Sequence, residues 1–92
     1  MLTLKTTKQY RKDRNRCKKR GYDMSLLDDV IETLLEQRPL APKHYDHALT
    51  GNYSGFRECH VLPDWLLIYR KEKKQLILTA SRTGTHSDLL EK

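Results

Sequence analysis

The amino-acid sequence predicts an α+β domain with an antiparallel-dominated, four-stranded sheet and two N-terminal helices packed on one of its faces. Three observations support this class. One apolar stripe marks a helix between Asp23 and Pro39, three strand candidates follow Gly55 with short turns between them, and a short alternating run opens the chain. A chain of 92 residues suffices for one domain with a modest core and shallow clefts, so we expect a single domain spanning 1–92.

The N-terminal twenty residues predict a short strand and then a helix. Residues 2–4 alternate between leucine and threonine, as strands with one buried face do. Thr6 or Thr7 can cap the helix that follows, which continues to Arg20 and is stopped by Gly21.

A second helix is predicted between a cap at Asp23 or Ser25 and an end at Pro39. Its first turn carries Asp28 and Asp29, whose charges are favourable at a helix N-terminus. The apolar positions repeat as adjacent pairs every four residues, and they are Leu26, Leu27, Val30, Ile31, Leu34 and Leu35. Such a stripe indicates a face buried in the core.

The remainder of the chain predicts one long loop and a three-stranded meander. Residues 39–55 contain two prolines and two glycines, which favours a loop, and long loops in compact domains are often functional. Strands are predicted at 56–61, 65–70 and 75–82. The middle segment is nearly all apolar, as expected for a central strand covered on both faces.

Positive charge is concentrated in the first helix. Residues 1–20 hold nine Lys or Arg against one acid, Asp13, giving +8, whereas residues 21–92 give −2. A solvated helix face is the ordinary interpretation of such residues, but this density favours a polyanion, with nucleic acid ahead of acidic protein and anionic lipid. The cations expected to bind it are Lys8, Arg11, Lys12, Arg14, Arg16, Lys18, Lys19 and Arg20.

Targeting signals and cysteine usage indicate a cytoplasmic protein. The first residues have no apolar h-region, and no run approaches the roughly 18 apolar residues that a membrane span needs, so no membrane association is expected. Cys17 and Cys59 lie far apart and form no CxxC pair. We therefore expect reduced thiols rather than a disulfide or a zinc cluster.

The candidate chemistry lies where the predicted elements end. The residues concerned are His47, His60, Asp64, Trp65, Arg82 and His86. Two imidazoles on either side of a phosphodiester can remove one proton and supply another, while a guanidinium holds the phosphate oxygens and Trp65 offers a face for a base. These groups suit the cleavage of RNA through its own 2′-hydroxyl, a reaction that needs no metal, and we expect no cofactor.

Each of these residues also has a structural explanation. A loop histidine is commonly exposed and idle, Trp65 alone is more typical of a core, and Asp64 after Pro63 is ordinary turn chemistry. The spacing of His44 and His47 also admits a metal site, completed by another histidine. Whether the last strand brings its arginine to the edge where the histidines lie is left open by the sequence.

The segment DHALTGNYSGFRECHVLPDWLLIYRKEKKQLILTASRTGTHSDLL, residues 46–90, resembles the YafQ branch of the RelE/ParE toxin superfamily. Members share D-H-x-L-x-G-x-x-x-G-x-R-x-x-H-x-x-P-D-W-x-L-I-Y followed by R-T-G-T-H. The resemblance covers about half the chain, and the N-terminal half matches in pattern more than in residues. It implies a RelE-like fold and a bacterial toxin that enters the ribosomal A site, cuts messenger RNA there, and is neutralised by an acidic, DinJ-like antitoxin.

The resemblance also implies roles for individual residues. The active site would comprise His47, His60, Asp64, Arg82 and His86, with Trp65 beside them. His47 and His86 would transfer protons in an order left open, and the arginine would neutralise the phosphate. His60 and Asp64 would orient their partners or tune the pKa of those partners.

Two further implications concern the ends of the chain. Leu90 stands where the family typically has Phe, which puts in doubt a stacking contact with the messenger. The basic helix would hold ribosomal RNA through its phosphates.

The alternative hypothesis is a non-catalytic binding toxin of the ParE type or a general RNA-binding module.

Overall fold

The computed structural model describes residues 1–90, and of Leu90 only the backbone. The elements run in the order β1 (Thr3–Thr6), α1 (Lys8–Lys19), α2 (Met24–Leu35), η1 (Pro42–His44), β2 (His47–Ala48), η2 (Gly51–Tyr53), β3 (Arg57–Leu62), β4 (Trp65–Glu72), β5 (Ile77–Gly84) and α3 (His86–Leu90). The two N-terminal helices and the α+β class predicted from the sequence are confirmed.

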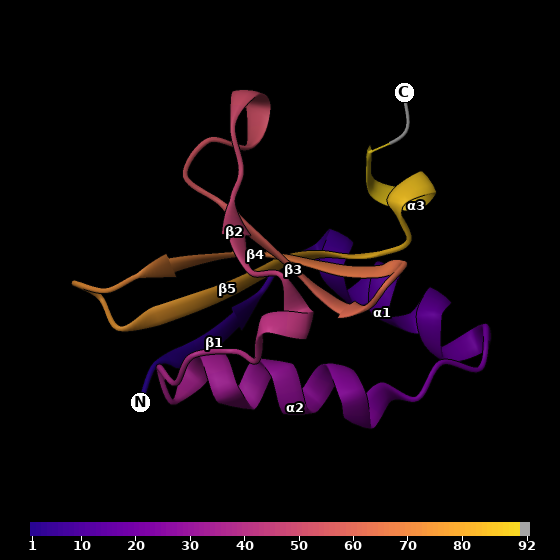
Figure 1. Cartoon of the computed structure of the whole chain (residues 1–92), viewed down its shortest axis with the longest axis horizontal. Coiled ribbons are helices and arrows are strands. Elements are labelled where there is room, and N and C mark those ends of the chain that lie inside the picture. The colour runs from indigo at the N-terminus through magenta and orange to yellow at the C-terminus, as the bar shows by residue number, and fades with distance from the viewer. Residues whose placement is uncertain (91–92) are drawn as a thin grey trace.

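The strands form one mixed sheet in the order β1-β5-β4-β3-β2. β1 pairs with β5 in parallel, and the three remaining pairs are antiparallel. α2 runs along one side of this sheet, whereas α3 lies on the other side (Figure 1). The parallel pairing places the first strand of the chain beside the last.

The sheet has five strands rather than the four predicted, because the long loop contributes β2. This two-residue strand pairs His47 with Glu58 of β3. Two residues are too few to show an alternating pattern, and they lie among prolines and glycines that indicate a loop. The extra strand nevertheless matters, because it fixes the position of a candidate catalytic histidine.

Helix caps follow the sequence except at the end of α2. The Thr7 hydroxyl accepts the Tyr10 N–H at 2.9 Å, and Asp23 caps α2. The prediction that Pro39 ends α2 is wrong, because Gln37 takes a left-handed conformation with φ 57° and its N–H bonds to Leu34 O. This closing turn leaves three residues between the last residue of the helix and the proline.

Apolar side chains pack on both faces of the sheet. The larger cluster joins the apolar stripe of α2 to Tyr10 and Cys17 of α1 and to Trp65, Leu67 and Tyr69 of β4. On the opposite face, Leu66 and Ile68 of β4 meet Leu89 of α3 and partly buried residues of the long loop. The alternation along β4 explains why its sequence is apolar at nearly every position.

Both cysteines are free and buried. Burial raises the pKa of the Cys59 thiol to about 12 and raises that of Cys17 as well, so neither presents a reactive thiolate. No helix within residues 1–90 has the length and apolar character needed to cross a membrane.

Candidate active site

Three imidazoles from separate parts of the chain meet at one site. The ring centroids of His60 and His86 lie 5.6 Å apart. His47 joins them through Glu58, whose Oε1 lies 3.2 Å from His47 Nε2 and 3.9 Å from His60 Nε2. The histidine cluster, as we call His47, His60 and His86, thus brings together a loop strand, β3 and α3.

Sheet register explains this convergence. His47 pairs with Glu58, and Glu58 lies two residues before His60, so both β3 side chains point to the same face. His60 pairs with Leu66 of β4, which in turn pairs with Gly84 at the end of β5. α3 begins two residues later and therefore carries His86 to the same end of the sheet.

Gly84 permits that close return of the chain. Its φ is 153°, and a Cβ built on it would lie 2.9 Å from Oδ2 of Asp88. A side chain at this position would push away the carboxylate that caps the start of α3. The arginine-glycine-histidine run at the C-terminus thus serves to place His86.

The His86 ring is held by Asp64. Asp64 Oδ1 accepts the His86 backbone N–H at 3.1 Å and lies 2.6 Å from His86 Nδ1. These hydrogen bonds lower the pKa of Asp64, which therefore stays ionised. An ionised carboxylate can only accept, so Nδ1 carries a proton, and in the neutral form of the ring the lone pair is then on Nε2.

The start of α3 is fixed by a reciprocal cap and by the basic helix. Thr85 N–H donates to Asp88 Oδ2 at 3.0 Å, while Asp88 N–H donates to Thr85 Oγ1 at 3.1 Å. Arg20, which follows α1, reaches the same carboxylate at 2.7 Å. The Arg20 guanidinium, with the Thr85 N–H, holds the pKa of Asp88 well below its usual range.

His47 faces a hydrogen-bond acceptor at each ring nitrogen. Its Nδ1 lies 2.8 Å from the Tyr45 carbonyl oxygen, and its Nε2 faces Glu58 Oε1. Only a ring with protons on both nitrogens can donate to both partners at once. The preceding Asp46 is itself bonded to Arg57 and to the Tyr69 hydroxyl, which anchors the loop.

Glu58 was not among the residues selected from the sequence. Its side chain is buried, with the residue 5% exposed, and its Oε2 has no hydrogen-bond partner within residues 1–90. The available signal was its position two residues before His60 on a predicted strand. A buried carboxylate with an unsatisfied oxygen is costly to fold, so it marks a group retained for something other than stability.

Arg82 is held by Asp13 rather than by the histidine cluster. Its Nε lies 2.7 Å from Asp13 Oδ2, and Asp13 raises the pKa of the guanidinium. Asp13 is fully buried and also accepts the Thr83 N–H at 3.2 Å. β4 lies between β5 and β3, so the strand that carries Arg82 is separated by one strand from the strand that carries His60. Arg82 pairs with Ile68, which pairs with Glu58, so the Arg82 side chain leaves the sheet on the face that carries Glu58.

Trp65 does not offer a stacking face. It is 2% exposed, and its indole N–H donates to Thr83 Oγ1 at 2.9 Å. The ring is enclosed in the larger apolar cluster, which gives no support to the prediction that a base stacks on its face. The side chain of Leu90, the other predicted substrate contact, lies outside the described part of the chain.

The basic helix contains two kinds of cation. Arg14 pairs with Asp28, Arg16 with Asp13 and Asp88, and Arg20 with Asp88, while Arg11 donates to Thr6. The lysines are exposed and, among the described residues, have no ion-pair partner; they are Lys8, Lys12, Lys18 and Lys19. The lysines are therefore free to bind phosphates, whereas the paired arginines help to fix the protein's own structure.

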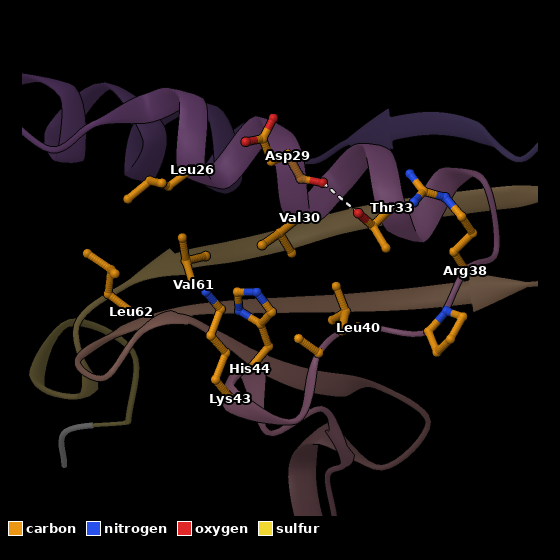
Figure 2. Close-up of a pocket in the computed structure, with 12 residues that line it drawn as sticks. Leu26, Asp29, Val30, Thr33, Arg38, Leu40, Lys43, His44, Val61 and Leu62 are labelled. Atoms are coloured by element: carbon orange, nitrogen blue, oxygen red, sulfur yellow. Dashed lines mark hydrogen bonds between the residues drawn. The ribbon is translucent and has the colours of Figure 1, made fainter.

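The metal site that the spacing of His44 and His47 admitted does not form among residues 1–90. His44 Nδ1 is 2.7 Å from the His60 carbonyl oxygen, and His44 lines a cavity of about 330 Å³ between α2 and the loop before η1 (Figure 2). Within residues 1–90 no three potential metal ligands lie close enough to share an ion.

Comparisons with known proteins agree on one family. A family model described as bacterial toxin of type II toxin–antitoxin system, YafQ, matches residues 2–91. The mRNA interferase toxin YafQ of Escherichia coli K12 is 42% identical over 82 residues, which cover 88% of this chain and 87% of that protein.

Solved structures confirm the fold. A metal-bound toxin from Helicobacter pylori superposes with a TM-score of 0.91 and 45% identity, covering 97% of this chain and 99% of that one. The YafQ chain of the E. coli DinJ–YafQ complex superposes with a TM-score of 0.87 and 34% identity, covering 97% and 98%.

Proposed function

The chain belongs to the YafQ family of bacterial toxins of type II toxin–antitoxin systems, and we propose from that membership how it acts. It is an mRNA interferase, an endoribonuclease directed at messenger RNA. The proposal is that it cuts the messenger in the ribosomal A site, by acid–base chemistry that uses the RNA's own 2′-hydroxyl as the nucleophile. No metal is needed for that attack, because the nucleophile already belongs to the substrate.

In the proposed step, one imidazole removes the 2′-hydroxyl proton while the oxygen attacks the adjacent phosphorus. The bond from phosphorus to the 5′-oxygen of the next nucleotide breaks, and a second imidazole gives that oxygen its proton. The products are a 2′,3′-cyclic phosphate and a free 5′-hydroxyl. At the end of the step the base carries the proton taken from the 2′-hydroxyl, and the acid has lost the proton given to the 5′-oxygen.

The observation that carries this proposal is the convergence of the histidine cluster. His86, with its proton on Nδ1 toward Asp64 and a lone pair on Nε2, suits the base. His47, whose two ring nitrogens both face acceptors, suits the acid, with the Nε2 proton shared with Glu58 until transfer. His60 then completes the site between them as an orienting group.

Arg82 is assigned to the phosphate. A guanidinium can hold two phosphate oxygens as negative charge develops on them. Its bond to Asp13 uses Nε and one terminal nitrogen, which leaves the other terminal nitrogen able to donate. Asp64 and Glu58 act as positioning residues through the histidines they contact.

Removal of His86 tests the chemistry. Replacing it with alanine should slow messenger cleavage on ribosomes by roughly 10²- to 10⁴-fold, the usual effect of losing a general acid or base. Ribosome binding should persist, since the lysines of α1 are untouched. The matched control is Ser87→Ala, in the same helix, which should cut at the parental rate.

Two results would contradict the assignment. One is parental cleavage by His86→Ala. The other is a 3′-phosphate formed by the parental protein without any cyclic intermediate, detected by end-group analysis. Growth arrest by the non-cleaving variant, equal to that of the parent, would instead favour a binding toxin.

Ribosomal RNA is the proposed partner of the exposed lysines. Neutral replacements at Lys8, Lys12, Lys18 and Lys19 should weaken ribosome binding and flatten its salt dependence. The log–log slope should fall by somewhat under one unit for each phosphate that the variant no longer binds. Replacing Lys73 and Lys74 of the β4–β5 turn is the control. Equal slopes for both sets would contradict a specific role for α1.

The proposed inhibitor is an acidic, DinJ-like antitoxin. Solved E. coli complexes pair DinJ with YafQ. A formal net charge of +6 on this chain favours a negatively charged partner. Co-expression with such a partner should restore growth, and a stable complex should survive size-exclusion chromatography.

A further inference from the structure

A cavity of about 420 Å³ opens beside the histidine cluster. The turn between α1 and α2, the first turn of α2 and the β3–β4 turn enclose it. Its lining consists of Gly21, Tyr22, Asp23, Leu26, Leu62, Asp64 and Trp65. These segments gather at the end of the sheet where α3 also begins (Figure 1). We refer to this space as the turn cavity.

The turn cavity shares a residue with the candidate active site. Asp64 lines the cavity and uses its Oδ1 for both hydrogen bonds with His86. Its Oδ2 accepts no hydrogen bond from residues 1–90. A ligand that reached Oδ2 would therefore lie next to the imidazole assigned to the 2′-hydroxyl proton.

The lining is apolar with carboxylates at its rim. Leu62 is 47% exposed although it is a leucine, and half-buried Tyr22 packs on Trp65 with ring centroids 4.8 Å apart. Asp23, like Asp64, uses Oδ1 within the protein, where it accepts from Ser25. The turn cavity thus combines apolar walls with two carboxylate oxygens available to a donor.

That combination suits a nucleobase rather than a phosphate. Carboxylates repel phosphate but accept hydrogen bonds from amino groups. Adenine, guanine and cytosine carry an exocyclic amino group, whereas uracil presents two carbonyl oxygens beside a single N–H. The volume is ample for one base between apolar walls, since small-molecule sites begin at about 300 Å³.

We propose that the turn cavity binds a messenger base adjacent to the scissile bond and selects bases that bear an exocyclic amino group, disfavouring uracil. The inference rests on the proposed function and deepens it. Asp23 and Asp64 are the acceptors, and Leu62 and Tyr22 form the walls.

A second cavity adjoins the turn cavity. Leu26 and Leu62 line both spaces, and in the second one they lie at the opposite end from Arg38 (Figure 2). Lys43 and His44 line it as well. The Lys43 ammonium and the Arg38 guanidinium of this second cavity supply what the carboxylates of the turn cavity cannot, a favourable surface for the phosphates of the neighbouring nucleotides.

Binding can be measured without cleavage. Trp65 is the chain's single tryptophan, so its indole N–H gives one resolved signal in a nitrogen-correlated NMR spectrum. Titration with adenosine or cytidine should shift this signal, together with the Leu26 and Leu62 methyl signals. Uridine at the same concentration should shift them far less. Equal responses to all three nucleosides, or none, would overturn the proposal.

Two variants test the assigned residues. Asp23→Asn keeps a side chain that caps α2 equally well but removes the charge, so adenosine affinity should fall about tenfold. Leu62→Ala removes an exposed wall and should also weaken binding. Glu32→Gln removes a charge from an exposed residue of α2 that lines neither the turn cavity nor the second cavity, and it should bind as the parent does.

Cleavage maps separate this inference from the proposed function. Messenger 5′ ends mapped after brief expression should show uracil disfavoured at one position beside the parental cuts, and Asp23→Asn should relax that bias. A parent that makes no cuts defeats the proposed function. Parental cuts with the same bias in Asp23→Asn defeat only the base pocket. If nucleosides fail to shift the Trp65 signal but an antitoxin shifts it, the cavity is an antitoxin site.

Discussion

At the scale of single residues, a carboxylate accompanies each group assigned to the reaction. Glu58 lies between His47 and His60, Asp64 holds His86, and Asp13 holds Arg82. A carboxylate bonded to an imidazole or guanidinium fixes its orientation and stabilises its charged form. Preorganisation of the imidazoles and the guanidinium therefore depends on these three acids.

Asp13 provides the sharpest test of that dependence. Asp13→Asn removes the charge opposite Arg82 and should slow cleavage by roughly tenfold to a hundredfold, because the guanidinium loses its fixed direction. Single-turnover assays on programmed ribosomes should be run well below the unfolding temperature. They measure the rate of cleavage separately from the affinity for the ribosome.

A double-variant cycle distinguishes positioning from general damage to the fold. If Asp13 acts through Arg82, the double variant with Arg82→Ala should be no slower than Arg82→Ala alone. Losses that multiply would mean that Asp13 acts by another route.

Replacing Glu58 with an apolar residue should raise the stability of the fold and lower the cleavage activity. Its buried, half-satisfied carboxylate destabilises the fold, so Glu58→Leu should raise the free energy of unfolding by about 1 kcal/mol while abolishing efficient cleavage. Urea unfolding and ribosomal cleavage assays measure the two effects. Glu58→Gln keeps a buried polar group and should gain no stability. A Glu58→Leu protein that is both less stable and fully active would refute this account.

Side-chain chemistry predicted the histidines better than their partners. His47, His60, Asp64 and His86 could be selected because they end elements in a plausible order, and the structure brings them together. Asp13 could not be selected, because its role depends on a contact 69 positions along the chain. Arg82 was selected as a candidate from its place at the end of the last strand, but its bond to Asp13 was invisible in the sequence.

At the scale of elements, α3 is too short to be stable alone. Its five residues depend on the cap formed by Thr85 and Asp88 and on the ion pair with Arg20. The basic helix thus does more than present positive charge, because the arginine at its C-terminal end secures the helix that carries His86.

The stability contributed by Asp88 should depend on pH. Its folded-state pKa lies below the unfolded value of about 3.9, so the contribution is complete above roughly pH 4 and is lost as the pH falls through the folded value. Asp88→Asn should lower the free energy of unfolding by about 1–2 kcal/mol at neutral pH, and the difference should shrink in acid. Urea titrations at a series of pH values measure it, with Asp29→Asn as the unpaired control. A difference that stays constant into acid would contradict the ion-pair origin.

Element boundaries were predictable where local chemistry decides them. Thr7 and Asp23 cap their helices because hydroxyl and carboxylate oxygens satisfy free N–H groups. The end of α2 was misjudged, because a proline is visible in the sequence whereas a left-handed Gln37 is not. β2 was missed because its pairing with β3 makes these two residues a strand, whereas their own sequence has no strand pattern.

At the scale of the whole molecule, sheet order determines what the site contains. The parallel pairing of β1 and β5 brings α1 against the C-terminal half of the chain, where Asp13 meets Arg82. β1 ends at Thr6 and therefore does not pair with the last residues of β5. The Thr83 N–H of that unpaired part of β5 donates to Asp13 instead. The charged N-terminal helix and the histidine cluster are therefore parts of one rigid arrangement.

That arrangement is open, and its openness predicts dependence on the ribosome. The His86 side chain is 49% exposed and that of Asp64 is 68% exposed, so within residues 1–90 the imidazole assigned as the base lies at the surface and is not enclosed around a flexible RNA. An RNA that is not held in this way does not gain the rate that proximity and orientation supply, which amounts to several orders of magnitude. Purified protein should therefore cut a naked transcript at least about a hundredfold more slowly than the same transcript on a translating ribosome. Comparable cleavage of naked and translated RNA would mean that the chain orients its substrate alone, through surfaces such as the turn cavity.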